Sequence, residues 1–242
     1  MAEYNRYSRD ELLHVLQARA RLEEDVLLQV DLARVTLHGL TVTRSTLRNT
    51  TLAQANLPGS RWEDALLQGA SLRKATLAGA SLDGCHLSGT DLIEVDLTGA
   101  VVAGTTFDGC ALQNARLEGA TLVGCTFLAT DLYRADLRGA RLLHCRFRDP
   151  NLGAASLSRA KLAGAVLVDC DLKEANLGEA DLAGALLVSC DLRAANGREA
   201  SFAKATLVAC NAEAAQLERA LLADLAHAET RFAHANTAGA RF

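Results

Sequence analysis

A five-residue repeat runs through almost all of this sequence and limits what it can fold into. Between Asp131 and Leu142, leucine recurs at 132, 137 and 142, each time with a small residue two places earlier. The count continues in both directions without insertion or deletion. Of the 43 positions at this spacing from Leu32 to Phe242, 30 are leucine, and the same places hold all six phenylalanines and Trp62. The large apolar side chains therefore share one phase of the repeat.

A period of five fits neither a regular helix nor a flat strand. On a helix five residues turn through about 500°, so successive leucines would build no face. On a strand an odd period would send alternate leucines to opposite faces. The leucines face a common axis only if the chain turns a corner every five residues, which predicts a solenoid. Columns at 20-residue spacing are coherent and favour four sides per coil. We therefore expect a core ladder of Leu132, Leu137 and Leu142 on successive sides and Phe107, Phe127 and Phe147 in one column.

The repeated phrase resembles the motif of the pentapeptide-repeat family. It reads ANLPG at 55–59, VDLTG at 95–99, ADLRG at 135–139 and ADLAG at 180–184. The resemblance covers about residues 30–242. It implies an all-β fold, a right-handed quadrilateral β-helix of about ten coils. Glycine fits the predicted corners, because 15 of the 18 glycines occupy the fifth place of the phrase.

The N-terminal segment, residues 1–29, is interpreted as a short α-helical cap on a β-helix formed by residues 30–242, the two together making one domain. Ser8 and Glu11 match a capping box. Leu12, Leu13 and Leu16 then form an apolar stripe at helical spacing. Such a helix would cover the apolar end of the first coil and its unpaired strand edges.

Two stretches depart from the pattern. Pro150 cannot donate a backbone hydrogen bond, so we expect a local bend or a missing hydrogen bond there. Gly197, Ala212 and His227 occupy inward places that should hold leucine, which predicts an underfilled core or bulged strands. Residues 211–229 also fit one helical face, but the repeat resumes after them without a shift, so a continued solenoid is favoured over a helix.

The composition excludes several classes of protein. The formal net charge of -4 is mild and argues against direct nucleic-acid or membrane-surface binding. The sequence contains neither a run of 18 apolar residues nor a signal segment, so a cytoplasmic location is expected. All seven cysteines fall at multiples of five, in the small inward place, where we expect free thiols acting as small hydrophobes. No CxxC motif points to a metal, and no cofactor is predicted.

No group of residues predicts catalysis. Cys85 and Cys145 each adjoin a histidine, but neighbouring residues should point to opposite sides of the wall, so no nucleophile pair is expected. Asp131, Asp171 and Asp191 form an outward column whose spacing follows from the repeat itself. This column is interpreted as a solvated, charge-balanced face. The chain is therefore predicted not to be an enzyme, with no catalytic, cofactor-binding or metal-binding residues.

One outward-facing surface is apolar, although its residues should be in contact with water. The residues flanking inward Leu167, Leu187 and Leu207 are mostly large and aliphatic, and further apolar residues follow on the adjoining side. Large apolar patches on a monomer usually mark a partner, although drift towards apolar residues in a repeat would produce the same pattern. The candidate protein interface consists of Val166, Val168, Leu186, Val188, Val208, Val123 and Leu143.

Two functional classes follow. The first is a non-enzymatic structural module, a rigid rod that binds a protein partner or itself. The contact would be the apolar surface or the C-terminal end. The resemblance also permits a secretion-associated adaptor or effector. The second, implied by the family, is a DNA mimic that modulates DNA gyrase or another topoisomerase and confers resistance to inhibitors or toxins. Mimicry needs a dense acidic face. Because arginine is interleaved with the acids here, gyrase is not the favoured partner.

Overall fold

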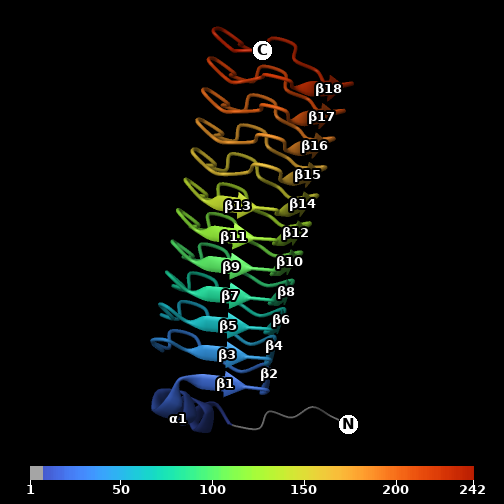
Figure 1. Ribbon diagram of the computed structural model, residues 1–242. Coiled ribbons are helices and arrows are strands. Elements are labelled where there is room, and N and C mark those ends of the chain that lie inside the picture. The colour runs from blue at the N-terminus through green and yellow to red at the C-terminus, as the bar shows by residue number, and fades with distance from the viewer. Residues whose placement is uncertain (1–7) are drawn as a thin grey trace.

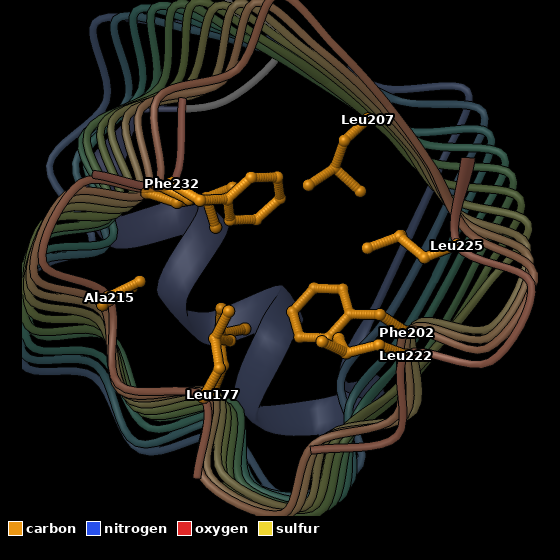
Figure 2. A pocket seen from close by; sticks show the side chains of 12 residues that line it. Leu177, Phe202, Leu207, Ala215, Leu222, Leu225 and Phe232 are labelled. Carbon is orange, nitrogen blue, oxygen red and sulfur yellow. The ribbon is translucent and has the colours of Figure 1, made fainter. Parts of the chain in front are cut away.

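The chain is a four-sided tube of stacked coils, closed at its N-terminal end by a helix (Figure 1). The computed structural model describes residues 8–242. It is a right-handed β-solenoid of about ten coils, as the repeat predicts. The view along the tube in Figure 2 shows the walls of successive coils in register, with the helix at the far end. Each coil takes 20 residues, because partners in neighbouring coils lie 20 positions apart.

Helix α1 spans Arg9–Arg19, and every strand is three residues long. One parallel sheet has seven strands in the order β1-β3-β5-β7-β9-β11-β13, and the other has eleven in the order β18-β17-β16-β15-β14-β12-β10-β8-β6-β4-β2. The strands are β1 Arg21–Glu23, β2 Val26–Leu28, β3 Thr41–Thr43, β4 Thr46–Arg48, β5 Arg61–Glu63, β6 Leu66–Gln68, β7 Ser81–Asp83, β8 His86–Ser88, β9 Val101–Ala103, β10 Thr106–Asp108, β11 Thr121–Val123, β12 Thr126–Leu128, β13 Arg141–Leu143, β14 Arg146–Arg148, β15 Val166–Val168, β16 Leu186–Val188, β17 Thr206–Val208 and β18 Ala226–Ala228.

The sides of the tube are of two kinds. On the strand sides three consecutive residues pair with the coils above and below. On the turn sides a single residue such as Asp91 pairs with its neighbours, Ser71 and Ala111, and a tight turn follows. The N–H of Val95 closes that turn by donating to the carbonyl of Leu92 at 3.0 Å. Both kinds place the fifth residue of the phrase at a corner with positive φ, for example Gly99 at 65° and Arg134 at 57°.

The small inward residue differs between the two kinds of side. All seven cysteines follow strand sides, where the side chain donates to backbone carbonyl groups. The Sγ of Cys110 lies 3.4 Å from the carbonyl oxygen of Leu87, and the Oγ1 of Thr130 lies 3.1 Å from that of Phe107. After turn sides alanine predominates, and its own N–H closes the turn. Cysteine here is thus a weak hydrogen-bond donor as well as the small hydrophobe that the sequence predicts.

The core is a column of aliphatic side chains with one aromatic stack. Leu132, Leu137 and Leu142 are fully buried. The rings of Phe107 and Phe127 stack with centroids 4.8 Å apart, and Phe147 continues the stack at the same spacing. Burial of each such side chain contributes about 1.5 to 3 kcal/mol. The backbone between coils is continuously paired, since the N–H of Leu132 donates upward to Asn151 and that of Asp131 downward to Cys110.

The N-terminal cap is shorter than the sequence predicts. The capping box of Ser8 and Glu11 is present, and the helix buries Leu12 and Leu16 against the first coil. The helix ends at Arg19, however, and β1 and β2 already pair with β3 and β4. The predicted boundary at residues 29 and 30 is therefore wrong, because Leu22 and Leu27 are in phase with the repeat and buried in the tube. Residues 1–7, which that prediction assigned to the cap, lie outside the described residues.

The two irregular stretches also follow the tube. Pro150 follows a strand side, where the N–H of the small residue takes no part in the backbone pairing of neighbouring coils. Its carbonyl still accepts from Asp171 at 3.1 Å, and Asn151 pairs with both neighbouring coils, so the predicted missing hydrogen bond is wrong. Residues 211–229 continue the solenoid, as favoured. The seven-stranded sheet stops at β13, because the following coils have a turn side where β13 would be repeated.

Candidate protein-binding surface

The outward side chains of β15, β16 and β17 form three apolar rows on one wall of the tube. Parallel pairing places Val166 beside Leu186, and Val168 beside Val188 and then Val208. The carbon atoms of these side chains partly shield one another, but Leu186 is still 37% exposed. We call these rows, with the β14 and β18 rows on either side of them, the β14–β18 face.

Val123 and Leu143 lie on the adjoining wall rather than on this face. They are partners in neighbouring strands β11 and β13, and Val123 is 37% exposed. The alanines that repeat their column, Ala163 and Ala183, precede β15 and β16 around the corner. The predicted interface residues thus occupy two adjoining walls. The outward Val101 of the same wall is more exposed still, at 50%, and the predicted interface did not include it.

Elsewhere on the rod, basic and acidic side chains pair between coils. Arg159 donates to Glu179 through two nitrogens, each at 3.1 Å, and Arg198 pairs with Glu218 in the same way at 3.0 and 3.1 Å. The Arg159 guanidinium lowers the pKa of Glu179 below its usual value. Such exposed pairs add little stability. Their main effect is to divide the acidic surface into short neutralised segments.

The outward aspartate column is part of the turns. The Oδ1 of Asp131 accepts the N–H of Tyr133 at 3.0 Å, and Asp171 and Asp191 accept in the same way from the residues two places ahead. Asn151 continues the column and donates its side-chain amide to Asp131 at 3.0 Å. The pKa of Asp191 is lowered, chiefly by its hydrogen bond with Arg193. These carboxylates therefore hold the turns in place, as local side-chain to backbone bonds do in other proteins.

Cysteine and histidine neighbours point to opposite sides of the wall. Cys85 and Cys145 are buried, whereas His86 and His144 are exposed. Burial raises the pKa of Cys85 to about 11. All seven thiols are free. Within residues 8–242, histidine, cysteine, aspartate and glutamate nowhere gather in a group of three suited to a metal ion. In the same range, helix length and hydropathy fall short of what a membrane-spanning segment needs.

The C-terminal coils contain an apolar cavity of about 20 Å³ (Figure 2). It lies where Gly197 and Ala212 take the places of inward leucines, so the underfilled core predicted from the sequence is present. Leu177, Leu207 and Phe202 point into it from the walls. At this volume the cavity holds no more than about one or two water molecules and offers no room for a larger ligand.

Comparison with known proteins finds one family model. The model for pentapeptide repeats matches residues 45–83, 75–113, 110–149, 151–187 and 175–211. No sequence among the functionally curated proteins matches the chain.

Solved structures with the same repeat are also similar. HetL, a pentapeptide-repeat protein involved in heterocyst differentiation regulation in the cyanobacterium Nostoc, is 27% identical, with 91% of this chain and 94% of that chain covered and a TM-score of 0.46. QnrB1, a plasmid-mediated fluoroquinolone resistance protein, is 18% identical, with 91% and 92% covered and a TM-score of 0.41. Rfr23 from the cyanobacterium Cyanothece is 23% identical, with 65% and 94% covered and a TM-score of 0.24.

Proposed function

This chain belongs to the pentapeptide-repeat family, and from that membership we propose that it is a non-enzymatic rod that binds another protein molecule through the β14–β18 face. Proteins of the family are typically interaction modules. The observation that supports the proposal is the apolar surface on one wall formed by the exposed Leu186 and the half-buried Val166, Val168, Val188 and Val208. A contiguous apolar surface of this kind is uncommon on a monomer unless a partner covers it.

The rod itself suits this role. Its walls are held by hydrogen bonds between every pair of neighbouring coils, so the outward rows keep a fixed spacing of about 4.8 Å. A partner therefore meets a surface that is already ordered, which reduces the entropic cost of binding. A cytoplasmic location stays a prediction.

A double charge substitution tests this role. Val168→Asp with Val188→Asp, which we call the face variant, places two carboxylates in the centre of the apolar rows without touching the core. We expect the face variant to keep the circular dichroism spectrum and melting temperature of the parent but to lose the parent's protein complexes, measured by affinity capture and light scattering. The matched control is Ala78→Asp with Thr98→Asp, which changes the same place of the phrase in two neighbouring coils of the opposite wall. If the face variant keeps every complex of the parent, the proposal is wrong.

The alternative, a DNA-mimicking modulator of DNA gyrase, has less support from the charges. Mimicry requires a continuous acidic track. The acids of this rod instead alternate with arginine, as in the Arg159–Glu179 and Arg138–Glu118 pairs. A gyrase supercoiling assay with and without an inhibitor separates the two functions. Protection of gyrase by the purified chain would favour the alternative.

A further inference from the structure

Five exposed charged residues at the two ends of the β14–β18 face lack an ion-pair partner within residues 8–242, and one of them is Asp149, which follows the β14 row. Arg146 and Arg148 belong to the β14 row, and Asp224 and Glu229 stand on either side of the β18 row. On the opposite wall charges at 20-residue spacing do pair, as Arg159 does with Glu179. Unpaired charges of opposite sign at opposite ends of an apolar surface suggest that the missing partners come from another molecule.

The five rows of this face are complementary to the same five rows of a second copy that is rotated about the central row, β16. A two-fold axis that runs parallel to β16, between two facing walls, reverses the order of the coils but keeps the direction of the strands. It therefore lays β15 over β17 and β14 over β18, with the first residue of each row over the first residue of its partner. Val168 then faces Val208 of the second copy, and Val188 faces its own counterpart. Two flat sheets with aligned strands can pack in this way, at a separation of about 10 Å.

The outer rows complement each other in size. The β14 row carries the two long exposed side chains of Arg146 and Arg148, while the β18 row presents only the methyl groups of Ala226 and Ala228. In the two-fold arrangement the arginines of one copy lie over these alanines of the other. The small side chains of the β18 row therefore leave room for the long side chains of the β14 row.

The charges complement each other in the same arrangement. Arg146 lies at the end of its row that faces Asp224, which precedes β18, and Arg148 lies at the end that faces Glu229, which follows β18. Arg148 also stands between Glu229 and its own neighbour Asp149, so it separates these two carboxylates. Because the axis is two-fold, each contact occurs twice. Arg146, Arg148, Asp224 and Glu229 thus each meet an opposite charge.

The charges also exclude the neighbouring registers. Moving the axis by half a coil towards the C-terminus lays β15 over β18 and sets Asp169 against Glu229. Moving it by half a coil towards the N-terminus lays the arginines over β17, away from both acids. Like charges opposed across an interface cost binding energy and suppress the wrong alignment. The register centred on β16 also sets Asp149 near Glu229, but there Arg148 lies between the two carboxylates, and both arginines meet an acid.

The other face-to-face arrangement, with the axis along the rod, is unfavourable. It keeps the coil order and reverses each strand, so every row meets its own copy. Arg146 would then lie over Arg148, and Asp224 over Glu229. Like charges would then face each other at both ends of the contact and repel. The arrangement in which the two rods run in opposite directions is therefore favoured.

We propose that the occupant of the β14–β18 face is a second copy of this chain, bound with its rod antiparallel in a two-fold dimer centred on β16. The inference rests on the proposed function and names the partner of the same surface. Five rows at about 4.8 Å make a contact only about 24 Å long, which falls below the area of a typical stable interface. We therefore expect a weak dimer with a dissociation constant in the micromolar range or above. Its affinity should fall as salt screens the charges at the two ends.

Sedimentation of the full chain from about 1 to 200 µM, at low salt and at about 0.5 M NaCl, tests the proposal. The parent should show a monomer–dimer equilibrium that salt weakens. Arg148→Glu alone and Glu229→Arg alone should each weaken dimerisation by roughly tenfold or more at low salt, and the double variant should recover most of the affinity. Exchange of a pair within the chain, Arg159→Glu with Glu179→Arg, is the control and should leave dimerisation unchanged.

Cysteine cross-linking tests the register. Val188 lies beside the two-fold axis, so a Val188→Cys chain should cross-link to itself with a short thiol-specific bismaleimide, which spans the gap of about 10 Å between facing sheets better than a direct disulfide. A Val208→Cys chain should not do so alone, because its two copies lie two coils apart, but it should cross-link when mixed with a Val168→Cys chain. The seven natural cysteines are buried, so the new thiols react first.

Three outcomes would overturn the dimer. The first is a monomer over the whole concentration range. The second is self-association that survives in the face variant, which would place the contact elsewhere, for example at the C-terminal coil. The third is failure of the double charge variant to recover, together with equal cross-linking of Val188→Cys and Val208→Cys chains. A monomer whose complexes with other proteins are lost in the face variant would refute the dimer and leave the proposed function standing.

Discussion

The ring of Phe127 lies flat on the ring of Phe107, with centroids 4.8 Å apart and planes at 4° to each other. Isolated aromatic pairs prefer offset or edge-on arrangements. Here the spacing between coils sets the distance between the two rings, so the repeat itself produces the stack. The stabilisation that the stack provides comes mainly from burial of the rings.

Phe127→Ala should therefore destabilise the tube strongly. Removal of a fully buried ring leaves a cavity between two other rings, and we expect the free energy of unfolding to fall by about 3 to 5 kcal/mol. Chemical denaturation measures this loss. Phe242 occupies the same phase of the repeat but is 83% exposed, so Phe242→Ala should change stability by no more than about 0.5 kcal/mol. Equal effects of the two substitutions would contradict the assigned core.

Ala212→Leu should stabilise the C-terminal coils. Ala212 occupies an inward place that elsewhere holds leucine, and it lines the apolar cavity. Filling that space should raise the free energy of unfolding by about 0.5 to 2 kcal/mol, measured by denaturation. The control is Ala135→Leu, in a small inward place without a cavity, where overpacking should cost about 1 to 3 kcal/mol. Destabilisation by both would mean that the cavity cannot accept the extra carbons.

Asp131→Ala should weaken one turn and the column of side chains beside it. The carboxylate accepts hydrogen bonds from the N–H of Tyr133 at 3.0 Å and from the side-chain amide of Gln113 at 2.5 Å. Their loss should cost about 1 to 2 kcal/mol of unfolding free energy, measured by denaturation. Asp131→Asn keeps an acceptor and should cost less. Asp108→Ala, on a strand side, is the control and should be nearly neutral.

Stability should fall in alkaline solution because of the buried thiols. Burial raises the pKa of Cys85 from 9.0 to about 11, so the folded chain holds this proton more tightly than the unfolded chain. The resulting stabilisation is complete below pH 9 and is lost as the pH rises towards 11. Cys85→Ala should reduce that loss by up to about 2 kcal/mol in denaturation experiments across this range. His86→Ala, which changes the exposed neighbour, should leave the pH dependence unaltered.

Much of the fold could be predicted because one physical requirement recurs at every coil. Leu132, Leu137 and Leu142 can share a core only in a tube with corners five residues apart. The start of the tube was missed because Leu22 and Leu27 stand in a segment whose other signals are helical.

The two kinds of side were also missed, although the small inward residue carries a signal for them. A cysteine or threonine in that place marks a strand side, where Cys110 and Thr130 donate to backbone carbonyl groups. Alanine is typical of a turn side, where the backbone N–H closes the turn, as at Ala135. The distinction depends on which carbonyl groups the small side chain can reach, and the five-residue repeat alone does not reveal that.

The binding surface was harder to predict than the fold. The alternation of inward and outward places identified Val166, Val168 and Leu186 as outward, because the phase of the repeat determines which way each side chain points. The sequence did not show that Val123 lies around a corner from them, or which charges lack a partner. Those facts depend on where side chains 20 residues apart end up in the coils.

The continuous pairing between coils gives the chain something like a reading frame. The amides that bond between coils do so to residues 19 or 21 positions away, as Leu132 does to Asn151 and Asp131 to Cys110. Deletion of one whole coil would shorten the rod and leave the remaining walls aligned. Loss of a single residue would instead turn every later leucine away from the axis, much as a one-base deletion garbles every codon downstream.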